Sequence, residues 1–150
     1  MKKQVVYLAG LISTDYPESL VWRTRVQQQL QDAGFEVRNP LRGKPTGLGS
    51  TDGGITTSIA SSRSLLLRDR KDVRESDIIL AHLELFGSPR PLIGTIAELA
   101  WASDEKKTVV AIAKKENKLM RSHPFISEFV TEYVETEDEA VDFIIKYYWL

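Results

Sequence analysis

Glu98 is the residue of this sequence that is best placed to do chemistry. It lies in a segment from Pro91 to Ala102 between two apolar runs, 77–83 and 108–113, which are typical of buried strands. A helix that joins two such strands is the βαβ unit of a parallel sheet, and such sheets bind ligands beyond the carboxyl ends of their strands. We expect Glu98 in the first helical turn at that edge, where the positive end of the helix dipole favours a carboxylate. An ionised carboxylate suits a nucleophile better than an acid.

The same spacing also has a structural interpretation. Thr95-x-x-Glu98 matches a capping box, in which Thr95 accepts from the Glu98 amide and the carboxylate reaches back. Capping boxes are common and nucleophiles are rare, so the spacing by itself favours the cap. The rest of the chain has to decide between the two interpretations.

The composition is that of an ordinary globular protein, with 42% hydrophobic and 27% charged residues among 150. That length predicts one domain over 1–150. The net charge of −1 provides no general attraction to nucleic acid or to an anionic membrane. The absence of cysteine excludes disulfides and thiol catalysis, and two distant histidines disfavour a His-rich metal site. No apolar run nears the roughly 20 residues that span a bilayer, and the N-terminus lacks a signal-peptide pattern, so we expect a cytoplasmic protein.

Strand and helix patterns alternate along the chain. Strands are expected at 4–9, 35–38, 77–83, 108–113 and 133–134. Helices are expected at about 15–33 and 58–75, between the third and fourth strands, in a short segment opened by His123, and after the capping box Thr136-x-x-Glu139.

Two segments outside these elements are rich in polar or charged residues. We expect 114–122 to be a charged loop, and the Gly-, Thr- and Ser-rich segment 41–57 to be a functional lid or a disordered segment. Gly43-Lys44 is not a phosphate-binding loop, because Arg38 and Pro45 occupy the positions of that motif's first glycine and its Ser or Thr.

This alternation predicts an α/β fold with three layers, in which helices cover a flavodoxin-like, doubly wound, five-stranded parallel sheet of order 2-1-3-4-5. Its switch point lies between the first and third strands. Tyr7 and Gly10 come from the end of the first strand, and 83–95 follow the third. We therefore expect Tyr7 and Glu98 to face each other across one crevice, although 91 residues separate them in sequence.

Five short motifs occur along the chain in the order of a known family. They are Val6-Tyr7-Leu8-Ala9-Gly10, Trp22-Arg23, Asn39-Pro40, Arg68-Asp69-x-x-Asp72-Val73-x-x-Ser76-Asp77-Ile78, and Gly94-Thr95-x-x-Glu98 with Ala100 and Ala102. Each motif alone is weak, but the ordered set is fairly specific and extends from the first to the fourth strand. The sequence resembles the nucleoside 2-deoxyribosyltransferases and their deoxynucleotide N-hydrolase relatives.

Members of that family cleave the N-glycosidic bond of a 2′-deoxynucleoside through a covalent deoxyribosyl-glutamate, by the logic of retaining glycosidases. The resemblance implies that Glu98 is the nucleophile, that Asp69 is the acid and base for the nucleobase, and that Tyr7 orients Glu98. It implies neither a metal nor an organic cofactor. Asp72 is the alternative acid, because it lies one helical turn beyond Asp69. The run Arg68–Glu75 that holds both aspartates also fits a solvated helix face with i,i+4 ion pairs.

Further residues are expected to contact the substrate: Gly10, Asp72, His82, Leu92, Gly94 and Thr95. Leu92 departs from the family, which commonly has Asp or Ser there to contact the base or a phosphate. Leucine can do neither. We therefore expect the protein to prefer nucleosides to 5′-monophosphates as substrates and to accept varied bases, unless Arg90 or the segment 41–57 supplies the polar contact. His82 fits a packed core histidine better than a substrate ligand.

Three functions are consistent with the sequence. The first is a deoxyribosyltransferase that acts on nucleosides. The second is a hydrolase of deoxynucleoside monophosphates, whose phosphate the arginines at 63, 68 and 70 could bind. The third is a nucleotide-binding module that has lost turnover. Leu92 is the feature of the sequence that keeps this third function under consideration. The expected partners are small-molecule nucleosides and nucleobases, rather than a nucleic acid polymer or a membrane. The aromatic end 147–150 fits either packing on the sheet or an oligomer contact, and we expect a homo-oligomer.

Overall fold

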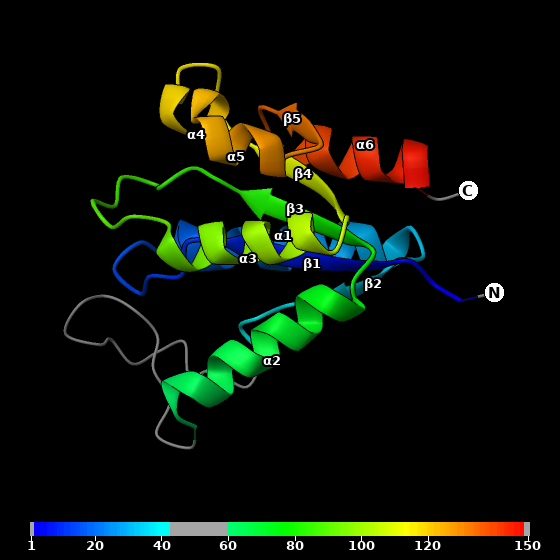
Figure 1. Ribbon diagram of the computed structural model, residues 1–150. Coiled ribbons are helices and arrows are strands. Elements are labelled where there is room, and N and C mark those ends of the chain that lie inside the picture. The colour runs from blue at the N-terminus through cyan, green and yellow to red at the C-terminus, as the bar shows by residue number, and fades with distance from the viewer. Residues whose placement is uncertain (1, 43–59, 149–150) are drawn as a thin grey trace.

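Five parallel strands form one sheet in the order β2-β1-β3-β4-β5, which confirms the predicted fold class and strand order (Figure 1). The computed structural model describes residues 2–42 and 60–148. Its strands are β1 (Val5–Gly10), β2 (Glu36–Arg38), β3 (Ile78–His82), β4 (Thr108–Ile112) and β5 (Glu132–Val134). All residues of β1 and β3 are buried, as expected for continuous apolar runs that are covered on both faces.

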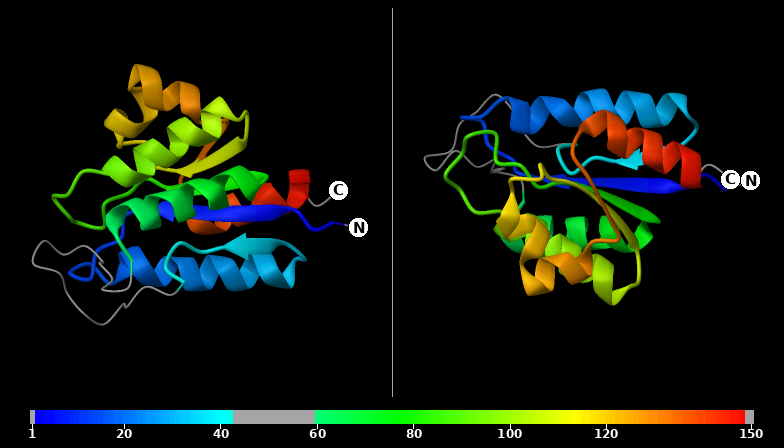
Figure 2. Two further views of the ribbon diagram at one scale, coloured as in Figure 1. Left: turned by 60° about the horizontal axis from the view of Figure 1, so that its bottom comes forward. Right: turned by 90° about the horizontal axis from the view of Figure 1, so that it is seen from above.

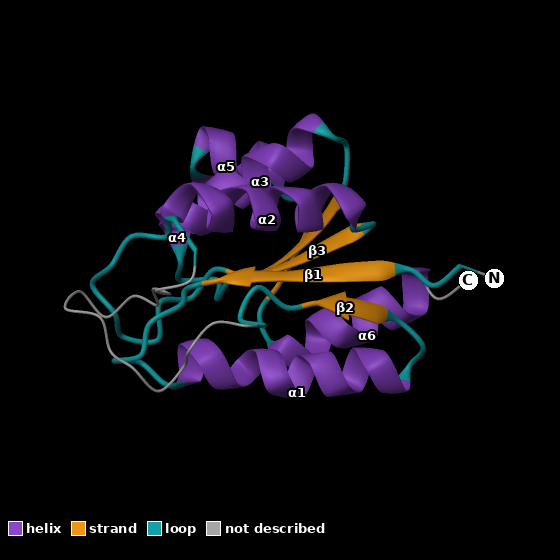
Figure 3. Cartoon of the chain, turned by 90° about the horizontal axis from the view of Figure 1, so that it is seen from below, coloured by secondary structure: helices purple, strands orange, loops and turns teal. Residues whose placement is uncertain are grey.

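Helices cover both faces of the sheet (Figures 2 and 3). One face carries α1 (Glu18–Asp32) and α6 (Glu137–Tyr148). The other carries α2 (Ser62–Glu75), α3 (Ile93–Asp104), α4 (Lys118–Ser122) and α5 (Pro124–Phe129). The layers are therefore helices, sheet and helices, as predicted.

The alternation of side chains along β1 decides which residues can reach the site. Val6 and Leu8 belong to the core cluster that contains residues of α1 and α6. Tyr7 and Ala9 belong to the cluster on the opposite face, which contains residues of α3. Because successive side chains of a strand point to opposite faces, Tyr7 is directed toward the same layer as Glu98.

Local signals set several helix ends where the sequence predicts them. Gly34 has a φ of 98° just after α1, a conformation that glycine adopts without strain. The predicted Thr136 cap after β5 forms, because the Glu139 amide donates to Thr136 Oγ1 at 3.1 Å, whereas the Glu139 carboxylate reaches one residue further back than in a capping box and accepts from the Glu135 amide. His123 caps α5 and is followed by Pro124 in the first turn.

Other local predictions are wrong. The segment predicted as a charged loop contains α4, whose Asn117 cap accepts from the Met120 amide. The helix predicted from residue 58 begins at Ser62 in the described part of the chain, capped by Ser61. Of the predicted segment 41–57, residues 41 and 42 form a turn and the rest lies outside the described residues, as do Trp149 and Leu150.

The predicted capping box at the start of α3 is also wrong. The helix begins at Ile93, two residues before Thr95, and Leu92 at the cap position makes no side-chain cap bond. Glu98 therefore lies in the second turn rather than the first, and the helix dipole, which acts within the first turn, is not the main source of positive potential for it.

Candidate active site

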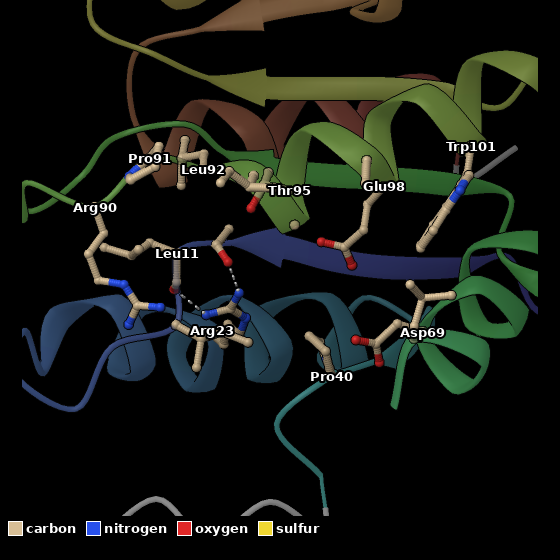
Figure 4. A pocket seen from close by; sticks show the side chains of 16 residues that line it. Leu11, Arg23, Pro40, Asp69, Arg90, Pro91, Leu92, Thr95, Glu98 and Trp101 are labelled. Atoms are coloured by element: carbon tan, nitrogen blue, oxygen red, sulfur yellow. Dashed lines mark hydrogen bonds between the residues drawn. The ribbon is translucent and has the colours of Figure 1, made fainter. Parts of the chain in front are cut away.

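A cavity of about 400 Å³ opens beside the carboxyl edge of the sheet. Its wall comes from the segments that follow β1, β2 and β3 and from helices α1, α2 and α3 (Figure 4). The side chains and backbone that line it include Gly10, Leu11, Arg23, Asp69, Arg90, Leu92, Gly94, Thr95, Glu98 and Trp101. This is the place where doubly wound sheets bind ligands.

The hydroxyl of Tyr7 donates a hydrogen bond to Glu98 Oε2 across 91 residues of sequence. The two residues meet because they lie at similar depths behind the sheet edge. Tyr7 stands three residues before the end of β1, roughly 10 Å back, and Glu98 stands five residues after the start of α3, roughly 7.5 Å back. The displacement of Glu98 into the second turn thus brings it level with Tyr7.

Tyr7 is fully buried, and Glu98 is only 9% exposed. Burial of the phenol, reinforced by the nearby Glu98 carboxylate, raises the pKa of Tyr7 well above its ordinary value. The hydroxyl therefore keeps its proton at neutral pH and acts as the donor of this pair. Glu98 accepts that bond while it faces the cavity.

Arg23 provides a buried positive charge in the same cavity wall. Its guanidinium donates to the carbonyls of Ser19 at 2.6 Å, Gly10 at 2.9 Å and Leu11 at 3.2 Å. Burial lowers the pKa of Arg23 to about 10, and the attraction of Glu98 opposes that fall. Arg23 is thus charged at neutral pH, fixes the loop after β1, and favours the ionised form of Glu98.

The two candidate acids on α2 have different surroundings. Asp69 lines the cavity and faces α3 from the opposite side (Figure 4). Asp72 is buried, and its carboxylate lies 2.6 Å from Arg42 Nη2 and 3.8 Å from Arg38 Nη1. The interpretation of this run as a solvated helix face is wrong for Asp72, because the two arginines reach over it from β2 and the turn that follows.

Four of the expected substrate contacts lie in the cavity wall: Gly10, Leu92, Gly94 and Thr95. At Gly10 a side chain would be crowded, because a Cβ atom would lie 3.1 Å from the His82 carbonyl oxygen and 3.2 Å from the Trp22 ring, and these neighbours would have to shift slightly. Leu92 is 4% exposed and presents an apolar surface there. Arg90, the proposed alternative source of a polar contact, lines the same cavity.

His82 does not join these residues. It packs between Trp22 and Phe86, with ring centroids 5.0 and 4.6 Å away, and its Nε2 lies 3.3 Å from Glu137 Oε2. It borders a separate, open cavity between β3 and α6. His82 lies four residues after Ile78 in β3, so both side chains point to the same face of the sheet, the face that α1 and α6 cover. The structure therefore places His82 outside the predicted site, as a packed and hydrogen-bonded histidine.

Comparison with known proteins identifies the family. A family model described as nucleoside 2-deoxyribosyltransferase matches residues 6–141. The chain belongs to the nucleoside 2-deoxyribosyltransferase family. A search of curated protein sequences finds no match to it.

Solved structures of low identity share the fold of this nucleoside 2-deoxyribosyltransferase family member. A CMP N-glycosidase from Clostridium botulinum is 19% identical, with a TM-score of 0.62 over 96% of this chain and 100% of that chain. A 2-deoxyribosyltransferase from Leishmania mexicana is 16% identical, with a TM-score of 0.66 over 97% and 99%. A molybdenum cofactor binding protein from Rippkaea orientalis is 16% identical, with a TM-score of 0.63 over 97% and 98%. These proteins show that one fold carries different functions.

Two residues of the cavity wall, Arg23 and Trp101, have no role among the predictions from the sequence. Arg23 was part of a quoted motif, but only its full burial at the cavity shows where its charge lies. Trp101 lines the cavity three residues after Glu98, a spacing that puts both side chains on one helix face. That spacing was visible in the sequence and could have identified Trp101.

Two of the arginines considered for a phosphate have structural partners. Arg68 donates to the carbonyls of Arg42 and Pro40, and Arg70 pairs with Glu105 at 2.7 Å. In residues 2–42 and 60–148, no group of His, Asp or Glu side chains is arranged to hold a metal ion. No helix in these ranges is long and apolar enough to cross a membrane.

Proposed function

We propose that this protein cleaves the N-glycosidic bond of 2′-deoxynucleosides and transfers the 2-deoxyribose to a second nucleobase. The observation that carries the proposal is the hydrogen bond from Tyr7 to Glu98 inside a cavity that Asp69 also lines. A carboxylate that accepts a hydrogen bond from a tyrosine hydroxyl, with a second carboxyl group across the cavity, provides the two groups that retaining glycosyl transfer needs.

Glu98 is the nucleophile in this proposal. Its carboxylate attacks C1′ of the sugar, the bond between C1′ and the base nitrogen breaks, and the electron pair leaves with the base. Asp69 donates a proton to the departing base, which makes it a better leaving group. The product of this step is a deoxyribosyl ester of Glu98 and a free base.

The second half-reaction reverses these roles. A different base enters, Asp69 removes its proton, and its nitrogen attacks C1′, so that the ester breaks and Glu98 leaves as a carboxylate. If water attacks instead, the result is hydrolysis. Tyr7 holds the carboxylate in one orientation through both steps, and the charge of Arg23 favours its ionised form.

A second candidate function is the hydrolysis of 2′-deoxynucleoside 5′-monophosphates. The presence of Arg90 in the cavity wall favours it, because a guanidinium is suited to bind a phosphate. The similarity to a protein described as a CMP N-glycosidase points the same way. A module that binds nucleosides without turnover is the third possibility, and the assay below separates all three.

We also propose that the protein forms a homo-oligomer. Phe125 on α5 is 71% exposed and Tyr147 on α6 is 65% exposed, and large exposed aromatic side chains are enriched at protein interfaces. Light scattering after size-exclusion chromatography tests this, and a monomer at micromolar concentration would refute it.

The proposed function is tested by incubating the protein with thymidine plus adenine, and separately with dTMP alone, and by following the products by chromatography. Formation of thymine and 2′-deoxyadenosine supports transfer, and release of thymine from dTMP alone supports the hydrolase. Binding of thymidine without any product would leave only the binding module.

The nucleophile is tested by Glu98→Ala, with Glu132→Ala, at an exposed position on the edge strand β5, as the matched control. We expect Glu98→Ala to lose at least ~10³ in rate, the scale for removal of a covalent catalyst, while it remains folded. The control should keep the wild-type rate. Near-native turnover by Glu98→Ala, or a trapped sugar adduct mapped by mass spectrometry to another residue, would overturn the assignment.

A further inference from the structure

The cavity has two chemically different ends, with Glu98 between them (Figure 4). One end carries the guanidinium groups of Arg23 and Arg90. The other carries Asp69 of α2 and Trp101 of α3. Trp101 lies eight residues after the start of α3, roughly 12 Å along the helix axis, so the aromatic end is well separated from the loop that follows β3.

We propose that Trp101 is the stacking platform for the nucleobase and determines how tightly the base is held. This inference rests on the proposed function, because it uses Asp69 as the acid that must reach the departing base. A base within reach of Asp69 lies at the Trp101 end of the cavity, since both side chains line that end. The sugar then lies over Glu98, and its 5′ side points toward the arginines.

The indole ring is held in place before any ligand binds. The guanidinium carbon of Arg70 lies 5.6 Å from the centroid of the Trp101 ring, a cation–π contact on one face. Arg70 is itself fixed by Glu105 at 2.7 Å, and Arg74 Nε lies 3.6 Å from the same carboxylate oxygen. A ring that is already oriented loses little freedom when a flat ligand stacks on its other face.

An apolar side chain adds to this end of the cavity. Leu66 lies one helical turn before Asp69 on α2, lines the cavity and is 42% exposed. A flat heterocycle that covers Leu66 and stacks on Trp101 removes apolar surface from water, while its edge remains near the Asp69 carboxyl. This combination fits purines and pyrimidines alike, because every base has a π-face that an aromatic ring can stack on.

The proposal is tested by direct binding of free adenine and free thymine, which needs no turnover. We expect both bases to quench tryptophan emission in the wild type, and the quenching to be lost in Trp101→Phe. Trp101→Leu should weaken binding of the bases about five- to 150-fold, the range found for loss of one base stack, with a larger effect for adenine because its stacking surface is larger. Tyr133→Leu, which removes a partly buried aromatic ring on β5 whose centroid lies 5.1 Å from the Arg121 guanidinium carbon, is the matched control and should bind both bases as the wild type does.

Kinetics provide the second measurement. If Trp101 acts by stacking, Trp101→Leu should raise KM by a similar factor and largely keep kcat, because Glu98 and Asp69 remain. Arg70→Met keeps the indole but removes the guanidinium that holds it. It should weaken binding of the free bases and raise KM, each by a smaller factor than Trp101→Leu. Thermal unfolding of each variant shows whether it is folded.

Two results would overturn the proposal. One is wild-type affinity for free bases in a folded Trp101→Leu variant. The other is failure of the wild type to bind either base. Failure of the proposed function looks different: the wild type would bind bases through Trp101 but form no product from thymidine or dTMP, and the stacking assignment would then stand without the catalytic one.

Discussion

Replacement of Tyr7 by phenylalanine removes one oxygen atom from the centre of the site. The ring belongs to the core cluster between β1 and α3, so Tyr7→Phe should leave the packing intact. What is lost is a hydrogen bond to an ionised group, which contributes about 1.5–3 kcal/mol. At about 1.4 kcal/mol per tenfold, full loss of that contribution in the transition state lowers kcat/KM by about ten- to 150-fold.

The pH dependence of Tyr7→Phe gives a second, independent readout. A hydrogen bond to the charged form of a carboxyl lowers its pKa, so loss of the Tyr7 donor raises the pKa of Glu98. The acid limb of the kcat/KM profile should therefore move to higher pH. The pKa of Tyr7 itself is raised by burial, so its contribution to stability is fully present below the unfolded-state pKa near ~10 and is lost as the pH rises from there through the folded-state pKa.

Tyr133→Phe is the matched control for this experiment. The Tyr133 hydroxyl donates to the Met120 carbonyl, away from the cavity, and this residue is partly buried. Both variants lose one hydroxyl and one hydrogen bond, so urea unfolding should show a loss of about 1 kcal/mol for Tyr133→Phe, whose bond is to a neutral carbonyl, and of about 1.5–3 kcal/mol for Tyr7→Phe, whose bond is to a carboxylate. Only Tyr7→Phe should lose activity. Wild-type kcat/KM with an unmoved acid limb in Tyr7→Phe would refute an orienting role for the hydroxyl.

Two further predictions concern the acid and the substrate. Asp69→Asn should slow cleavage most for bases that are poor leaving groups, which need protonation most, whereas Asp72→Asn should lower the free energy of unfolding by about 1–3 kcal/mol because it weakens the ion pair of the buried Asp72 carboxylate with Arg42. Leaving-group dependence seen only in Asp72→Asn would reverse the two assignments. Because Leu92 offers no polar contact, the wild type should have a higher kcat/KM for thymidine than for dTMP, and Leu92→Asp should narrow the choice of base. Arg90→Met should reduce kcat/KM for dTMP but not for thymidine, and a strong wild-type preference for dTMP would show that the protein is a monophosphate hydrolase.

The fold and the meeting of Tyr7 with Glu98 could be predicted from the sequence. Continuous apolar runs separated by helical segments specify a parallel sheet, since such strands must be covered on both faces. The connection rules for that sheet then bring the ends of the first and third strands together. These are properties of local periodicity and chain order, so no knowledge of individual contacts is needed.

The choice between neighbouring side chains depended on the tertiary structure. Asp69 and Asp72 lie on the same helix, and their spacing does not distinguish their roles. The fold places Arg38 of β2 and Arg42 of the following turn beside Asp72, which therefore forms ion pairs. The His82 side chain points to the face of the sheet opposite the site. Which face it takes becomes certain only when the register of β3 with β1 is known. Ion pairs and registers join residues far apart in the chain, and spacing carries no information about them.

The electrostatics of Glu98 are likewise a product of the fold. From the sequence, the helix dipole was expected to favour its carboxylate, but α3 begins earlier than the Thr95-x-x-Glu98 pattern predicts and places Glu98 beyond the first turn. Its partners are instead the buried hydroxyl of Tyr7 and the buried charge of Arg23. The sequence alone determined that a carboxylate stands at this edge of the sheet. Burial of groups from three separate elements decided its surroundings, because desolvation and long-range pairing exist only in the folded chain.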